Sequence, residues 1–115
     1  MVYLVQDPPP KWVPDGLGSG TRQKLNFGPA LKYGRELETL LPTQDFVLSP
    51  APAIAQLRKK LRNFGGEDFL LLVGDPIAIG MAMKIAAEAN GGVVRCLRWM
   101  KTERDYVEVK VDFNR

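Results

Sequence analysis

The feature that most constrains the fold is the stretch FLLLVGDPIAIGMAMKIAAEANGG, residues 69–92. Its apolar run stops at Gly-Asp-Pro, and a segment rich in alanine and methionine follows. A short run of continuous apolar residues is typical of a strand that is buried on both faces of a sheet. Asp75 suits the N-cap of a helix, Pro76 suits its first position, and Gly91 suits the left-handed position after its end. The stretch therefore predicts a central strand, a tight turn and a helix that runs to about Asn90.

A second helix is predicted over residues 50–63, with Ser49 as its N-cap. One apolar stripe recurs at intervals of three and four residues, made of Ile54, Leu57, Leu61 and Phe64. Shorter apolar runs predict strands at 2–6 and 46–49. Residues 30–42 are ambiguous, and one interpretation is a helical turn that precedes a strand.

The C-terminal residues VVRCLRWM and YVEVKVDF alternate in polarity as the strands of a hairpin do, with residues 101–105 as the connection. Pairing Met100 with Tyr106 places Arg98 opposite Glu108, which is a favourable cross-strand pair. In this register one face is apolar: Leu97, Trp99, Val107, Val109, Val111 and Phe113. The other face is polar: Arg98, Tyr106, Glu108, Lys110 and Asp112. We therefore expect helices to cover only one face of this part of the sheet.

These elements predict one small α/β domain over residues 1–115, since a chain of 115 residues suits a single domain. We expect a mixed sheet with a βαβαβ core, an antiparallel C-terminal hairpin strand, and helices mainly on one face. Residues 7–29 are rich in proline and glycine and show neither a helical nor a strand period. They predict a long loop or arm, and Trp12 within it indicates that part of the arm packs on another surface.

The sequence contains no histidine, which excludes Ser-His-Asp and Cys-His catalysis and removes the commonest zinc ligand. With one cysteine, no internal disulfide can form, and a reducing cytoplasm is the simplest location. Cys96 is expected to be an inert, partly buried thiol. No segment has the pattern of a signal peptide or of a membrane span. We therefore expect no cofactor, no metal and no catalytic residue. A non-enzymatic role is favoured over an enzymatic one.

The Gly74-Asp75 turn has two interpretations. A turn at the carboxyl end of a central strand can bind a ligand, and the free amides of a helix N-terminus attract anions. However, an aspartate at the N-cap accepts hydrogen bonds from those amides and places a negative charge where a phosphate would bind. The glycine-rich patterns of phosphate-binding loops are absent from the residues that follow. A structural cap is favoured, and a small nucleotide-handling enzyme is kept as an alternative.

Residues 56–63 form a basic helix surface, which carries Arg58, Lys59, Lys60 and Arg62. Such a surface can contact the phosphates of nucleic acid. Aromatic residues that could stack on bases are not interleaved with these charges, and the net charge of +3 is modest. A solvated helix face is favoured, and nucleic-acid binding is kept as an alternative function.

The leading hypothesis is a non-enzymatic binding protein that acts through protein–protein contacts. The candidate contact residues are Trp12, Arg22 and Lys24 in the arm, and Ile77 and Lys84 in the helix over 76–90. Ile77 is chosen because the helical period leaves this apolar side chain exposed beside the turn. A homodimer that pairs through the strand at 106–113 is left open, although the charges of that strand discourage pairing.

Over roughly residues 30–113 the chain resembles small uncharacterised proteins encoded by tailed bacteriophages. The resemblance rests on the segments LLP, LSPAPAIAQLRKKLRNF, FLLLVGDPIAIGMAMKIAAEANGG and LRW. It implies a phage product made in the cytoplasm of a bacterial host, and it carries over no catalytic residue. Together with the binding hypothesis, it implies an accessory or host-interaction protein whose partner is a host or phage protein.

Overall fold

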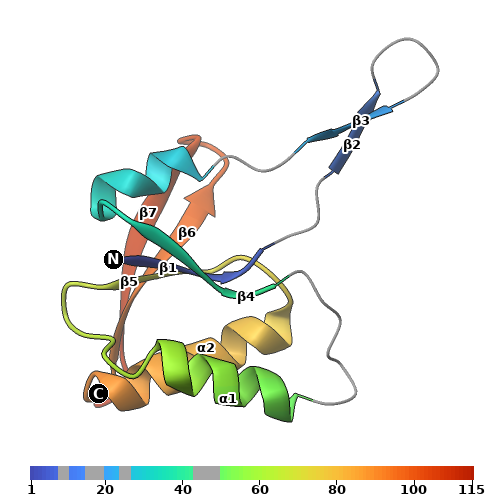
Figure 1. The fold of residues 1–115 in the computed structure, drawn as a ribbon. Coiled ribbons are helices and arrows are strands. Elements are labelled where there is room, and N and C mark those ends of the chain that lie inside the picture. Colours follow the sequence, from blue (N-terminus) through green and yellow to red (C-terminus); the bar gives the residue numbers. More distant parts are fainter. Residues whose placement is uncertain (8–10, 15–19, 24–26, 43–49) are drawn as a thin grey trace.

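A mixed five-stranded sheet forms the centre of the protein (Figure 1). The computed structural model describes residues 1–7, 11–14, 20–23, 27–42 and 50–115. The strands lie in the order β4 (Leu37–Leu41), β1 (Val2–Gln6), β5 (Phe69–Leu71), β6 (Val93–Met100) and β7 (Asp105–Asp112). Neighbouring strands are parallel from β4 to β6, and β7 is antiparallel to β6. The predicted α/β fold with a mixed sheet and an antiparallel C-terminal strand is confirmed.

The two α-helices cover one face of the sheet, as predicted. Helices α1 (Ala51–Lys60) and α2 (Pro76–Ala89) lie below the sheet in Figure 1, and the 3-10 helix η1 (Gly28–Tyr33) lies above it. Because successive side chains of a strand point to opposite faces, β1 contributes to two cores. Its residues Tyr3 and Val5 join the core beneath α1 and α2, and Val2 and Leu4 join the core on the η1 side.

Strand β5 is buried on both faces, which confirms the prediction made from its continuous apolar run. Leu70 faces the helices, whereas Phe69 and Leu71 face η1. Strand β1 lies between β4 and β5, so the connection from β4 through α1 to β5 passes over one strand. The βαβαβ core therefore consists of β4, α1, β5, α2 and β6. The strand predicted at 46–49 and the Ser49 cap lie outside the described residues.

The two helices follow the predicted patterns closely. In α1 and the turn after it, Leu57, Leu61 and Phe64 are buried and Ile54 packs against the core. The helix itself ends at Lys60, earlier than the predicted limit, and Pro50 precedes it. In α2 the predicted boundaries hold, and its buried residues are Ala78, Ala82, Ile85, Ala86 and Ala87.

The C-terminal hairpin forms, but the predicted register is wrong by one residue. Met100 pairs with Asp105, and Trp99 pairs with Tyr106. A four-residue turn closes the hairpin, and its last residue, Arg104, adopts a positive φ of 50°. The shorter turn places Tyr106 in the buried core beside Leu97. A slip of one residue moves every side chain of β7 to the opposite face relative to β6.

This register changes which side chains meet across the hairpin. Arg95, rather than Arg98, binds Glu108, with Nε to Oε2 at 2.9 Å and Nη2 to Oε1 at 3.1 Å. The guanidinium of Arg95 also lies 4.2 Å from the ring centroid of Phe69. The expected single apolar face is therefore wrong: Trp99 is 45% exposed on the η1 side and Phe113 is 57% exposed. The valines of β7 face the helix side instead, since Val109 pairs with Cys96 and Val111 packs on that core.

Part of the predicted arm has regular structure. Strands β2 (Lys11–Pro14) and β3 (Gly20–Gln23) form an antiparallel pair that stands apart from the five-stranded sheet (Figure 1). The expectation of no strand in residues 7–29 is therefore wrong for these two segments. Each strand has four residues, which is too short for a polarity period to be recognised.

Candidate functional site

The turn between β5 and α2 is closed by hydrogen bonds from within the protein. Asp75 caps α2, because its Oδ1 accepts the amide hydrogen of Ile77 at 2.8 Å. The amide of Asp75 donates to Gln6 Oε1 at 2.8 Å, and Gln6 Nε2 donates to the carbonyl of Pro42 at 3.3 Å. Gln6 is 93% buried, with 7% of its surface exposed. Two amides that could bind an anion at this helix N-terminus therefore have partners already, which favours the structural interpretation of the turn.

Gly74 allows this closure. Its φ of +122° lies in a region that other residues rarely adopt, and an added Cβ would lie 2.5 Å from Gln6 Cβ. The sequence analysis did not single out Gln6. The only signal was a polar amide at the end of an otherwise apolar strand, VYLVQ.

The outward face of α2 carries two of the predicted contact residues. Ile77 is 53% exposed, and the Lys84 side chain is 73% exposed. They are seven residues apart, so they lie on the same side of the helix. Lys84 Nζ lies 3.1 Å from Glu88 Oε1, and together with Arg58 it lowers the pKa of Glu88.

A groove of about 480 Å³ lies between α2 and the end of β7. Its lining is Gly80, Met83, Lys84, Ala87, Glu88, Gly92 and Phe113. Gly80 is exposed, and a Cβ added to it would meet nothing within 4 Å. The packing of α2 on the sheet therefore does not require a glycine at this position.

Two of the predicted contact residues of the arm lie opposite each other in the structure. Trp12 and Arg22 are direct cross-strand partners in the β2–β3 pair. Lys24 lies outside the described residues. The base of the arm is fixed beside α2, because the amide of Asp7 donates to Leu41 at 3.1 Å and the preceding Gln6 binds Asp75. The predicted contact residues thus form two groups, one on the arm and one on α2, and the arm begins beside the start of α2.

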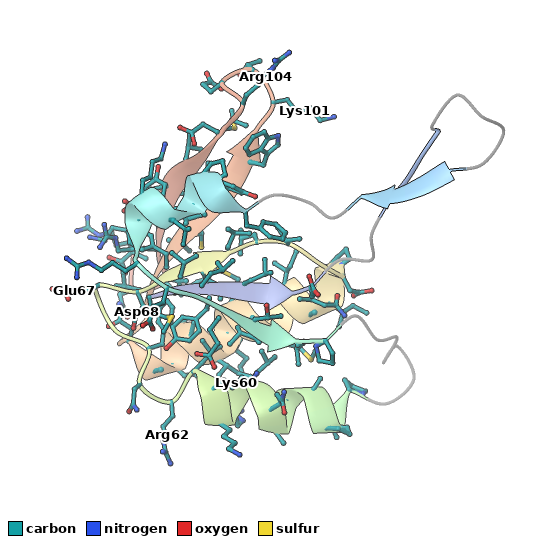
Figure 2. The ribbon with its side chains drawn as sticks, turned by 45° about the horizontal axis from the view of Figure 1, so that its top comes forward. Lys60, Arg62, Glu67, Asp68, Lys101 and Arg104 are labelled. Atoms are coloured by element: carbon teal, nitrogen blue, oxygen red, sulfur yellow. The ribbon has the colours of Figure 1, made fainter. Side chains whose placement is uncertain are left out.

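Two of the four residues of the basic helix surface, Arg58 and Lys60, have partners within the protein. Arg58 Nη1 lies 3.1 Å from Glu88 Oε2, and Lys60 Nζ donates to the carbonyl of Thr39 at 2.9 Å. Lys59 and Arg62 are exposed, and neither has an ion-pair partner among the described residues. In Figure 2, Lys60 and Arg62 lie by α1, whereas Lys101 and Arg104 lie at the far tip of the β6–β7 hairpin. These basic side chains do not gather on one surface.

Cys96 is 1% exposed, and its Sγ lies 3.3 Å from Met83 Sδ. Burial raises the pKa of the thiol to about 11. We therefore expect the folded protein to react very slowly with a thiol reagent such as DTNB at neutral pH, because the thiolate is the reactive form. The same chain in concentrated guanidinium chloride should react at the rate of a free cysteine. Equal rates for the folded and unfolded chains would contradict this assignment.

Within the described segments, no group of three His, Cys, Asp or Glu side chains is placed to hold a metal ion. Nor does that part of the chain contain a helix long and apolar enough to cross a membrane. Asp68 accepts the amide hydrogen of Gly65 at 2.9 Å and lies 3.4 Å from the N-terminal amine.

Comparison with known proteins gives a match to a protein family. A family model, described as phage Pam3 gp32-like protein, matches residues 1–113. No curated protein and no solved structure matches the chain. The predicted resemblance to phage proteins is confirmed, and the match extends it to the N-terminal residues.

Proposed function

The chain belongs to the phage Pam3 gp32-like protein family, and from this premise we propose that it is a non-enzymatic binding protein that acts through protein–protein contacts. Its role is that of a phage accessory or host-interaction protein in the cytoplasm of the bacterial host. The contact residues are Trp12, Arg22 and Lys24 on the arm, with Ile77 and Lys84 on α2.

The observation that carries this proposal is the β2–β3 pair. A two-stranded hairpin on its own is marginally stable in water, and it gains stability when another surface packs on it. In the part of the chain that the structure describes, β2 and β3 pair only with each other. Tryptophan and arginine dominate the energetics of many protein interfaces. The pairing of Trp12 with Arg22 therefore supports an arm that is completed by a partner.

The position of Ile77 supports a contact surface that includes both the arm and the start of α2. This side chain is 53% exposed in the first turn of α2, two residues after Asp75. Asp75 is bound to Gln6 at the base of the arm. A partner that engages the arm near its base can thus bury Ile77 in the same contact.

Affinity capture from a bacterial lysate with matched variants tests the role of the arm. We expect Trp12→Ala and Arg22→Ala to lose the captured protein, with little change in the melting temperature. The control variants Lys59→Ala and Arg62→Ala, which remove exposed side chains at the C-terminal end of α1 and just after it, should retain it. If Trp12→Ala lowers the melting temperature and leaves capture intact, Trp12 packs on its own domain and the proposal is wrong for the arm.

Nucleic-acid binding through α1 is the first alternative. Of the four basic residues proposed for it, Lys59 in α1 and Arg62 in the turn after α1 are exposed, but Arg58 and Lys60 already have partners. Binding through phosphates falls steeply as salt rises. Weak binding that does not change with salt would remove this alternative.

A small nucleotide-handling enzyme at the Gly74-Asp75 turn is the second alternative. The hydrogen bonds of Asp75 and Gln6 at that turn argue against it. A ligand that binds the folded state raises the melting temperature. No shift with a panel of nucleotides and divalent metals would leave this alternative without support.

A further inference from the structure

We propose that a second copy of this chain pairs with β7, antiparallel and about a two-fold axis at Val109, and so joins the two sheets. The inference concerns the edge of the sheet, and it does not depend on the partner proposed for the arm.

Strand β7 is the last strand in the order of the five-stranded sheet. The amide of Phe113 donates to the carbonyl of Gly92 at 2.8 Å. Along an antiparallel pair of strands, hydrogen-bonded residue pairs alternate with pairs that are not hydrogen-bonded. Because Phe113 belongs to a hydrogen-bonded pair, the odd-numbered residues of β7 direct their backbone groups to β6. The even-numbered residues, which include Glu108 and Lys110, direct theirs outward. Within the described residues, no strand pairs with this outer edge.

The middle of the edge strand is complementary to itself. Residues 107–111 read Val-Glu-Val-Lys-Val, which is symmetric about Val109 except for the sign of the charge. Antiparallel pairing centred on Val109 sets Glu108 opposite the partner's Lys110, and Lys110 opposite the partner's Glu108. Opposite charges at directly paired positions stabilise a sheet. The charges that discourage other neighbours therefore favour a second copy.

The registers next to this one are excluded by geometry or by charge. A shift that pairs an even residue with an odd one sets outward backbone groups against inward ones, so no ladder can form. The next allowed register on one side pairs Glu108 with the partner's Glu108. The next on the other side pairs Lys110 with the partner's Lys110. Like charges at paired positions are destabilising, so the register centred on Val109 is favoured over both of these neighbours.

The side chains on both faces of β7 are compatible with a dimer centred on Val109. On the helix side, Val109 is 39% exposed and would meet the partner's Val109 at the axis. On the η1 side, Glu108 already binds Arg95, and Lys110 lies directly opposite Arg95 in its own hairpin. In the dimer the partner's Lys110 lies directly opposite Glu108, on the edge away from Arg95, and the partner's Glu108 lies directly opposite Lys110.

The paired segment is short. The amide of Tyr106 donates to Asp105 Oδ1 at 2.8 Å, and its carbonyl accepts from the Tyr33 hydroxyl at 2.9 Å. The outward groups of Tyr106 are thus engaged, and the ladder consists of Glu108 and Lys110 from each copy. A small interface of this kind is typical of weak association, so the dimer should depend on concentration.

Sedimentation equilibrium with charge-swapped variants tests this register. We expect the wild-type chain to dimerise reversibly, and Lys110→Glu to weaken association by about tenfold or more, because two attractive pairs become repulsive. Lys110→Glu leaves the Arg95–Glu108 pair in place. The control Lys101→Glu makes the same charge change at the hairpin turn and should leave association unchanged.

Rescue by opposite charge makes the test specific. Glu108→Lys alone should also be monomeric, whereas an equimolar mixture of Glu108→Lys and Lys110→Glu should form a heterodimer. The double variant Glu108→Lys/Lys110→Glu should regain the homodimer. Melting temperatures show that each variant is folded. A wild-type chain that stays monomeric at high concentration, or variants that show no rescue, would overturn the proposal.

Discussion

Replacing Gly74 with alanine is expected to lower the free energy of unfolding by about 2–5 kcal/mol, which is a large part of the stability of a small domain. The φ of +122° at this position is strained for a residue with a Cβ. The added Cβ would also lie 2.5 Å from Gln6 Cβ and 2.9 Å from Gln6 Oε1. Gln6 must then move, and its hydrogen bonds to Asp75 and Pro42 are lost. Urea unfolding followed by circular dichroism measures the effect.

Gly80→Ala is the matched control for that experiment. Gly80 lies in the interior of α2, and a Cβ there meets nothing within 4 Å. Alanine is a better helix former than glycine, so this variant should gain about 1 kcal/mol of stability. If both substitutions stabilise the protein, the close contact between Gly74 and Gln6 is not present in solution.

Leu70→Ala is expected to lower the free energy of unfolding by about 2–5 kcal/mol. Leu70 is fully buried in β5, where it faces the core beneath α1 and α2. Truncation removes apolar contacts and leaves a cavity that the central strand cannot easily close. Leu31→Ala serves as the control, since Leu31 is 46% exposed in η1 and its loss should change stability by about 0.5 kcal/mol or less. Equal effects at the two positions would contradict the central place of β5 in the core.

The strand–turn–helix unit could be predicted because its signals are local. The apolar run of β5, the Asp75 cap, Pro76 and Gly91 each act within a few residues, and the structure has them in the expected roles. The position of β1 between β4 and β5 could not be predicted in this way. It depends on pairing between segments that are more than thirty residues apart along the chain.

The hairpin register shows how a difference of one residue in the connection moves every side chain of β7 to the opposite face of the sheet. The predicted five-residue connection and the observed four-residue turn differ only in whether Asp105 belongs to the strand. Asp105 is held by Lys32 of η1, and Tyr106 accepts a hydrogen bond from Tyr33. Both partners come from a distant segment, so the alternation of polarity in β7 alone could not select the register.

The candidate contact residues were predicted from residue type, and the structure supplies their grouping. The pairing of Trp12 with Arg22 could not be foreseen, because the arm gave no strand period. The role of Gln6 at the turn was missed, since an amide closes that turn only once β1 and β5 lie side by side. The groove beside Phe113 was also missed, because the predicted register placed that side chain on a covered face.

The proposed function depends above all on whether this phage family member binds a protein. The most direct measurement is affinity capture of the tagged wild-type chain from a bacterial lysate, with and without nuclease, read by mass spectrometry. We predict a stoichiometric protein partner that survives nuclease treatment. Recovery of nucleic acid, or of proteins that disappear after nuclease treatment, would contradict this account and assign binding to the basic surface of α1.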